Sequence, residues 1–394
     1  MQLKKENTVG IAFVLASITA LTPLAIDMYL PAFPAIAAGL GAREEAVQLS
    51  LTSFFIGLAI GQLVYGTLAD RFGRKIPLFG GLLLASVASL LCATAESIDT
   101  LIAMRFLQAF GVCAGAVIAR AVVRDLFNAR EGARFFSLLM AIMGVAPILA
   151  PLAGAYVAGT LGWPWIFNLI AGFGFFALAI SSVFLPETHG PNPGVLFTRA
   201  FHTYADVLKN RSFLKYAMAG GAANGGMFAY ITGSSLVIQN HFGMSPDFFA
   251  LAFGFNAFGL IGLTQLNRVL LARYELSQIL SMGLVLILLA SAGLMAVAIA
   301  DGPLWLFLVP LFFYIASLGI LMPNNMAAAM ESEGARAGSA SALSGSLNFT
   351  IAFAASAVIG QFEASSAVPL ATVMTVLAVI SFIFTKLPET KSNP

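Results

Sequence analysis

The chain has 394 residues, of which 59% are hydrophobic and only 10% are charged, against roughly 25% charged residues in soluble domains. This composition excludes an ordinary soluble enzyme or binding domain and indicates a multi-pass membrane protein. The net charge of +2 gives no reason to expect a nucleic-acid partner. The two cysteines lack metal-ligand spacing and no phosphate-binding loop is present, so we expect no metal and no cofactor.

Apolar stretches recur along the chain, each long enough to cross a hydrocarbon core of roughly 30 Å. We expect twelve membrane-spanning helices. Their predicted ranges are 9–31, 46–67, 76–95, 99–122, 133–158, 163–186, 213–238, 246–270, 275–299, 303–327, 336–360 and 366–387. The first is not expected to be a cleavable signal peptide, because Asp27 interrupts its apolar run.

The basic residues set the expected orientation in the membrane. Of the 20 Lys and Arg residues, Arg43 alone falls in an odd-numbered loop, and Arg105 and Arg120 fall within the fourth span. All others lie in or beside the even-numbered loops and the termini. By the positive-inside rule this side is cytoplasmic, which predicts that both termini lie in the cytoplasm.

Two internal similarities divide the chain into halves. Leu-Pro-Glu-Thr closes the sixth span at 185–188 and the twelfth at 387–390, and the segment 66–71 resembles 262–268. The polar stretch 187–212 lies between the halves. We therefore expect an all-α fold of two pseudo-symmetric six-helix bundles, residues 1–186 and 213–394, joined by a cytoplasmic linker at 187–212.

One carboxylate and one guanidinium lie deep in the predicted spans. Of the 18 Asp and Glu residues, Asp27 alone is placed well within a span, and no histidine lies in one. Arg105 in the fourth span falls at a similar depth, about 6–9 Å from the outer membrane surface. A charge at this depth costs about 3 kcal/mol and therefore indicates function. Asp27 is the candidate proton site, with Arg105 as its partner.

Three interpretations of these charges remain open. In the first, Arg105 pairs with Asp27 in one conformation and releases it in another, which would couple proton movement to transport. In the second, the two residues form a permanent ion pair between the first and fourth spans. In the third, each side chain bonds separately to the end of a helix. Arg120, nearer the cytosol, is either a snorkelling or Asp125-paired residue or a cavity group.

A charged motif follows the second span. The segment Gly66-Thr-Leu-Ala-Asp70-Arg71-Phe-Gly73-Arg74-Lys75 resembles the loop between the second and third helices of the major facilitator superfamily. The resemblance implies that Gly66, Asp70, Arg71, Gly73, Arg74 and Lys75 form a conformational latch. The alternative is a plain cytoplasmic loop that obeys the positive-inside rule.

Further segments resemble the twelve-span drug/H+ antiporters, and among them the bicyclomycin and chloramphenicol resistance subfamily. These are Ile26-Asp27-Met28-Tyr29-Leu30-Pro31, the run 119–125 and Gly226-Met227-Phe228-Ala229-Tyr230. The resemblance implies a proton-driven multidrug efflux antiporter, not an enzyme. Such a protein is expected to be a multi-pass monomer of the bacterial inner membrane that exports amphipathic antibiotics. The alternative is a proton-linked exporter or importer of a metabolite such as an amino acid or sugar. A membrane receptor or an intramembrane enzyme is not expected, because the chain lacks both an attached soluble domain and plausible catalytic partners for Asp27.

Two helix motifs vary the family pattern. Arg105-Phe-Leu-Gln108-Ala-Phe-Gly111 resembles the fourth-helix R-x-x-Q-G motif with Ala109 in place of glycine, and the fifth span carries a looser version of the antiporter signature. The predicted helix-bending residues of that signature are Gly144, Pro147, Pro151 and Gly154. Aromatic and amide side chains in the spans suit amphipathic ligands. The candidate substrate-binding residues are Tyr29, Gln108, Asn224, Phe228, Tyr230 and Asn256.

Overall fold

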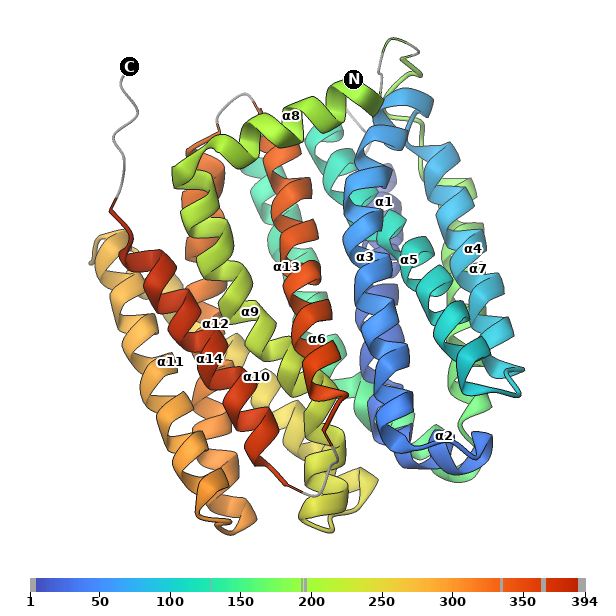
Figure 1. The fold of residues 1–394 in the computed structure, drawn as a ribbon. Coiled ribbons are helices and arrows are strands. Elements are labelled where there is room, and N and C mark those ends of the chain that lie inside the picture. Colours follow the sequence, from blue (N-terminus) through green and yellow to red (C-terminus); the bar gives the residue numbers. More distant parts are fainter. Residues whose placement is uncertain are drawn as a thin grey trace. The chain divides into compact units, whose positions relative to one another are not determined.

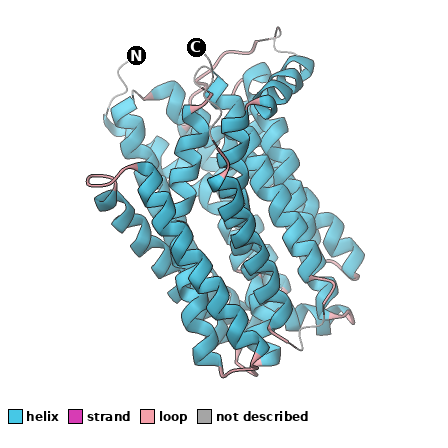
Figure 2. Cartoon of the chain, turned by 60° about the vertical axis from the view of Figure 1, so that its left-hand side comes forward, coloured by secondary structure: helices cyan, strands magenta, loops and turns pink. Residues whose placement is uncertain are grey.

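The computed structural model describes the backbone of residues 5–127, 129–192, 194, 197–333, 336–362 and 366–388. Every regular element in these ranges is a helix, as Figure 2 shows. The chain divides into two compact units, Met1–Arg43 with Ser53–Ala200 and Glu44–Thr52 with Phe201–Pro394. Each unit is a bundle of long helices, as expected for the all-α fold.

The first unit is built around α1. Its elements are α1 (Lys5–Asp27), the 3-10 turn η1 (Leu30–Ala32), α2 (Phe33–Leu40), most of α3 (Glu44–Phe72), α4 (Lys75–Ala93), α5 (Ile98–Leu126), α6 (Ala129–Thr160) and α7 (Pro164–Phe184). Helix α1 packs against α5, α6 and α7, and α4 packs against α5 and α7. The carboxyl end of α1 is therefore surrounded by other helices.

The second unit is built around α9, which packs against α12, α13 and α14 (Figure 1). Its elements are the first residues of α3, most of α8 (Phe197–Lys209), α9 (Arg211–Leu236), the π-helical turn η2 (Val237–His241), α10 (Pro246–Leu270), α11 (Leu276–Ile299), α12 (Leu304–Glu331), α13 (Ala337–Ile359) and α14 (Val368–Lys386). Helix α9 is buried along most of its length. Its glycines and polar side chains therefore face protein rather than lipid.

The prediction of twelve spanning helices is confirmed. Within the described residues, ten helical segments are long and apolar enough to cross a membrane on their own. The other two expected spans are α6, whose described apolar part is Val145–Thr160, and α9. Helix α9 falls below the usual hydropathy of a span because it is buried inside its unit.

The first span differs from its predicted range of 9–31. Helix α1 ends at Asp27, and the chain then continues through η1 and α2 to Leu40. Pro31 and Pro34 lack the N–H groups that would bond the carbonyls of Asp27 and Leu30 in a continuous α-helix. The helix therefore stops at the one acidic residue in its apolar run.

The linker contains a helix that the sequence analysis did not predict. In α8, Tyr204 and Val207 are buried, while Asp206 and Lys209 pair on the exposed side. The spacing of its apolar residues is the signal that would have revealed an amphipathic helix. Asn210, which follows α8, caps α9 and donates hydrogen bonds to Ser332 O at 3.1 Å and Glu333 Oε1 at 2.7 Å.

Helix α6 carries the predicted helix-bending residues. Pro147 and Pro151 both lie inside it, while the side-chain position of Gly144 lies outside the described residues. Gly154 faces the backbone carbonyl of Met28, so closely that a Cβ atom would collide with it. This glycine lets α6 approach the chain directly after Asp27.

We expect Gly154→Ala to lower the stability of the protein by about 1–3 kcal/mol, because an extra methyl group has no room between α6 and Met28. Thermal unfolding of the detergent-purified protein would measure the change. Gly159→Ala in the same helix is the matched control, since a Cβ atom there meets nothing within 4 Å. Equal losses in the two variants would contradict the packing role of Gly154.

Candidate functional site

Asp27 is a buried acid with no counter-ion among the described residues. It is the last residue of α1, and only 4% of its surface is exposed. Its carboxyl group forms no hydrogen bond or ion pair with any residue that the structure describes. Removing an unpaired charge from water is costly. An uncharged carboxylic acid is therefore the form that fits this conformation.

Arg105 is fully buried on α5 and does not pair with Asp27. Its Nη1 donates to Ala25 O at 2.9 Å and to Gln108 Oε1 at 2.6 Å. Ala25 lies in the last turn of α1, where carbonyl groups lack partners in the helix and carry partial negative charge. Of the three interpretations, the structure shows Arg105 in the third, bonded to a helix end.

Aromatic rings take the place of a carboxylate around Arg105. Its guanidinium carbon lies 4.2 Å from the ring centre of Phe54, 4.5 Å from that of Tyr29 and 5.8 Å from that of Phe167. A desolvated cation gains about 2 kcal/mol from each good ring contact. Nε and Nη2 of Arg105 nevertheless have no hydrogen-bond partner. The guanidinium is thus held in place with two donors unused.

Two predicted substrate residues support Arg105 in this structure. Gln108 is fully buried and donates from Nε2 to Ser89 Oγ at 2.7 Å, while Ser89 donates to Ala85 O at 2.7 Å. Tyr29 is fully buried against Arg105 and stacks edge-on with Phe33, at 4.8 Å between ring centres. Sequence analysis missed Ser89, which is one of two serines in the apolar run of α4.

Arg120 lies in the carboxyl-terminal part of α5, and its side chain is exposed. Its Nη2 donates to Gln62 Oε1 on α3 at 2.8 Å. Asp125, the partner considered for it, instead accepts from Arg74 and Thr188. The structure therefore does not show the Asp125-paired arrangement of Arg120.

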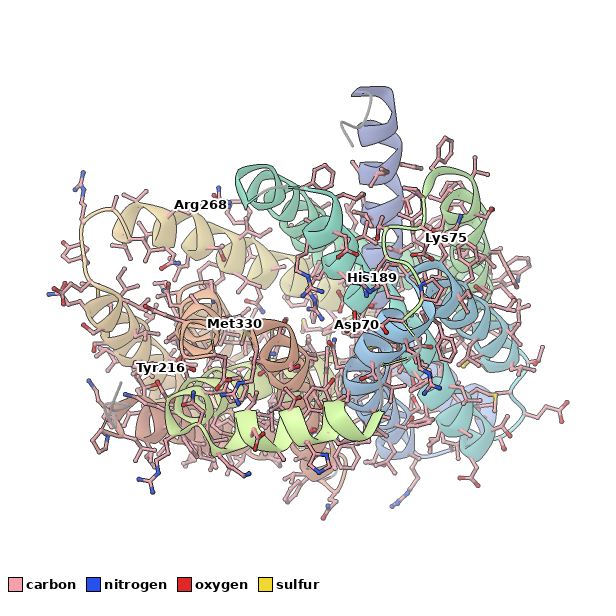
Figure 3. All side chains as sticks on the ribbon, turned by 90° about the horizontal axis from the view of Figure 1, so that it is seen from above. Asp70, Lys75, His189, Tyr216, Arg268 and Met330 are labelled. Carbon is pink, nitrogen blue, oxygen red and sulfur yellow. The ribbon has the colours of Figure 1, made fainter. Side chains whose placement is uncertain are left out.

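The predicted latch contains a buried charge network, which Figure 3 views from above with Asp70, Lys75 and His189 labelled. Arg74 is 2% exposed and bonds Asp70 Oδ1 at 2.7 Å and both carboxylate oxygens of Asp125, at 2.8 and 3.3 Å. Burial opposes the charge of Arg74, but the hydrogen bonds from Asp125 and Asp70 raise its pKa above the ordinary value. Thr188 also donates to Asp125 at 3.0 Å.

Glu187 of the repeated Leu-Pro-Glu-Thr segment caps α4. Its Oε1 accepts from Arg74 N at 2.7 Å and its Oε2 from Lys75 N at 3.0 Å. A carboxylate at a helix N-terminus satisfies unpaired N–H groups and the helix dipole. Gly73 has φ +84°, and a Cβ atom there would lie 2.8 Å from Glu187 Oε2. In the second copy of the repeat, Glu389 and Thr390 lie outside the described residues.

The other predicted latch residues take smaller parts in this network. Arg71 accepts a hydrogen bond at its carbonyl from Asn192 N at 3.0 Å and places its guanidinium over Phe72. The Lys75 ammonium lies over the ring of Phe79. Gly66 has open space where a side chain would be, so packing does not require a glycine there.

The second unit brings together two of the remaining candidates. Asn256 of α10 donates from Nδ2 to the Tyr230 hydroxyl of α9 at 2.9 Å. Tyr230 stacks on Phe253 at 5.2 Å between ring centres, and Phe228 contacts Phe349. Asn224 is buried with no hydrogen-bond partner for its Oδ1. Tyr230 and Asn256 thus form one polar pair, which does not include Asn224.

We expect Asp125→Asn to destabilise the protein by about 1–3 kcal/mol, because it leaves buried Arg74 with a weaker partner. Asp206→Asn is the control, since its pair with Lys209 is exposed and solvent screens the attraction. Thermal unfolding at low and high salt would compare the two variants. A smaller loss at Asp125 than at Asp206 would show that the buried network does not stabilise this end of the unit.

Known proteins resemble the chain over almost its whole length. The family model of the Major Facilitator Superfamily matches residues 15–357. The chain is 39% identical over 381 residues to an uncharacterized MFS-type transporter, YdgK, of Bacillus subtilis, covering 95% of this chain and 94% of that protein. It is 29% identical over 385 residues to a bicyclomycin resistance protein homolog of Haemophilus influenzae, covering 96% of each.

A solved structure agrees with this assignment at the level of the fold. The crystal structure of a D-xylose-proton symporter superposes with a TM-score of 0.75 over 98% of this chain and 99% of that one, at 15% sequence identity. The charged motif after the second span, the fold and the match of the family model all point to the same group. The chain belongs to the major facilitator superfamily and is a multi-pass membrane transporter rather than an enzyme.

Proposed function

We propose that the protein is a proton-coupled antiporter that exports amphipathic antibiotics of the phenicol or bicyclomycin type by alternating access. The observation that carries this proposal is Asp27, buried at the end of α1 and paired with no described residue. The same helix end accepts a hydrogen bond from Arg105, which keeps two unused donors. Similarity to a bicyclomycin resistance protein homolog supports the substrate class. The proposal places a monomer in the bacterial inner membrane with both termini in the cytoplasm.

The arrangement suggests how proton movement is coupled to conformation. With Asp27 protonated, Arg105 bonds the Ala25 carbonyl two residues earlier in the same helix end. When the proton leaves, the carboxylate requires a cation, and the free Nε and Nη2 donors of Arg105 are available to it. Pairing would change how the end of α1 packs against α5. The two protonation states thus favour different arrangements of the bundle.

Asp27→Asn is expected to abolish uphill export, because an amide cannot carry the exchanged proton. The measurement is transport in proteoliposomes with an imposed pH gradient, using phenicols, bicyclomycin, small amino acids and sugars. Asp206→Asn, which alters an exposed pair, is the matched control and should transport like the wild type. Undiminished uphill export by Asp27→Asn would eliminate the coupling role, and movement of metabolites alone would overturn the antibiotic assignment.

Substitution of Arg105 separates coupling from a purely structural role. Arg105→Ala is expected to shift the pH profile of ligand binding, because Asp27 loses the cation that becomes available to it on deprotonation. Arg105→Lys keeps the charge but not the planar donor arrangement and should restore part of the profile. Binding titrations across pH 5–9 on folded, purified variants would measure this effect. An identical profile in all three proteins would make Arg105 structural only.

A further inference from the structure

A pocket of about 240 Å³ lies between α10 and α12 of the second unit. Helix α10 contributes Ala252, Phe255 and Asn256, which share one helix face, and α12 contributes residues that include Val309, Phe312 and Phe313. Apart from Asn256, the lining is entirely apolar. The pocket is therefore a largely aromatic site with a single polar group.

The pocket is open at the surface of membrane-spanning helices. Phe255 is 61% exposed, Val309 53% and Phe313 46%, although all three lie on membrane-spanning helices. Counting from the first residues of α10 and α12, the lining residues lie roughly 6–15 Å along these helices. This range lies within one half of a hydrocarbon core roughly 30 Å thick, and Asn256 is nearest its middle. A ligand would reach the pocket from within the bilayer.

The polar wall of the pocket is fixed and has an unused acceptor. Asn256 is 2% exposed and its Nδ2 donates to the Tyr230 hydroxyl at 2.9 Å. No described residue donates to its Oδ1. Tyr230 is itself held by stacking on Phe253. Asn256 therefore presents a buried amide oxygen to whatever enters, and a polar group at this depth gains by binding a donor.

The aromatic wall is also preorganised. Phe312 stacks on Phe255 with ring centres 4.8 Å apart and an interplanar angle of 29°. It packs directly over Gly259 of α10, where a Cβ atom would lie only 2.5 Å from the ring. Glycine at 259 therefore sets the position of the Phe312 ring. The ring faces favour an aromatic occupant through stacking and edge contacts.

The volume limits the size of the occupant. A 150 Å³ apolar cavity holds benzene, whereas whole drug-sized ligands occupy pockets of roughly 300–1,000 Å³. The geometry points to a site for one substituted aromatic ring that carries a hydroxyl or N–H donor, entered sideways from the membrane. The further role of this pocket as an entry site for the aromatic part of an exported antibiotic rests on the proposed function. The binding of a substituted aromatic ring in the pocket does not depend on that function.

The first test is binding of 4-fluorophenol to the detergent-purified full chain, followed by fluorine NMR without any pH gradient. We expect saturable binding, with fluorobenzene weaker by about fivefold because it lacks the donor to Asn256. Ala252→Leu should lower the affinity for 4-fluorophenol about tenfold or more by filling the pocket. Asn256→Leu should remove the preference for 4-fluorophenol over fluorobenzene. Ala179→Leu, on the lipid-facing side of α7, is the matched control and should bind like the wild type.

Three outcomes would overturn the inference. These are an absence of saturable binding, equal binding of 4-fluorophenol and fluorobenzene in the wild type, and unchanged affinity in Ala252→Leu. Competition by phospholipid acyl chains with no preference for the phenol would identify the site as a lipid contact instead. If the protein binds 4-fluorophenol but exports no antibiotic in proteoliposomes, the pocket stands and only the proposed function is refuted. If Ala252→Leu exports antibiotic and binds 4-fluorophenol like the wild type, only the pocket is refuted.

Discussion

The burial of Arg105 without a carboxylate partner is the constraint on which the first unit depends. A guanidinium inside a membrane bundle requires acceptors and polarisable neighbours. Here they come from the end of α1, from Gln108 and from the rings of Tyr29 and Phe54. Because Pro31 and Pro34 stop α1 at Asp27, the carbonyl of Ala25 becomes available in the last helical turn. The end of this one helix thus positions the Asp27 carboxyl group and also supplies the carbonyl that holds Arg105.

At the other end of the first unit, a second buried arginine, Arg74, is stabilised by carboxylates instead. Arg74 is as buried as most core residues, but it pairs with the carboxylates of Asp70 and Asp125. The neighbouring N-terminus of α4 is capped by Glu187, which lies far away in the sequence. These contacts join the end of α3, the start of α4, the end of α5 and the segment after α7. Arg74 is therefore fixed by full pairing, whereas Arg105 retains free donors. Only the second arrangement leaves an arginine able to exchange partners.

In the second unit the polar groups belong to helices that are mostly buried. Helix α9 carries Asn224 and Tyr230 within a glycine-rich sequence and packs against three neighbours. Its amide and hydroxyl groups are shielded from lipid, and the pair Tyr230 with Asn256 ends at the wall of the membrane-facing pocket. A transporter of amphipathic molecules needs apolar surfaces with few fixed polar groups, and this unit offers such a combination between α10 and α12.

The sequence by itself determined the twelve spans, the all-α fold and the isolation of Asp27 and Arg105, because hydropathy and charge are properties of local segments and need no knowledge of distant contacts. The end of α1 was also encoded locally, by Pro31 and Pro34, although the predicted span ran past it. Only the tertiary structure decided that Arg105 donates to the end of α1 and that Gln108 donates to Ser89 rather than facing an open cavity. Those choices depend on which side chains from α1, α4 and α5 meet, and helix packing sets that arrangement rather than the spacing of residues along one helix.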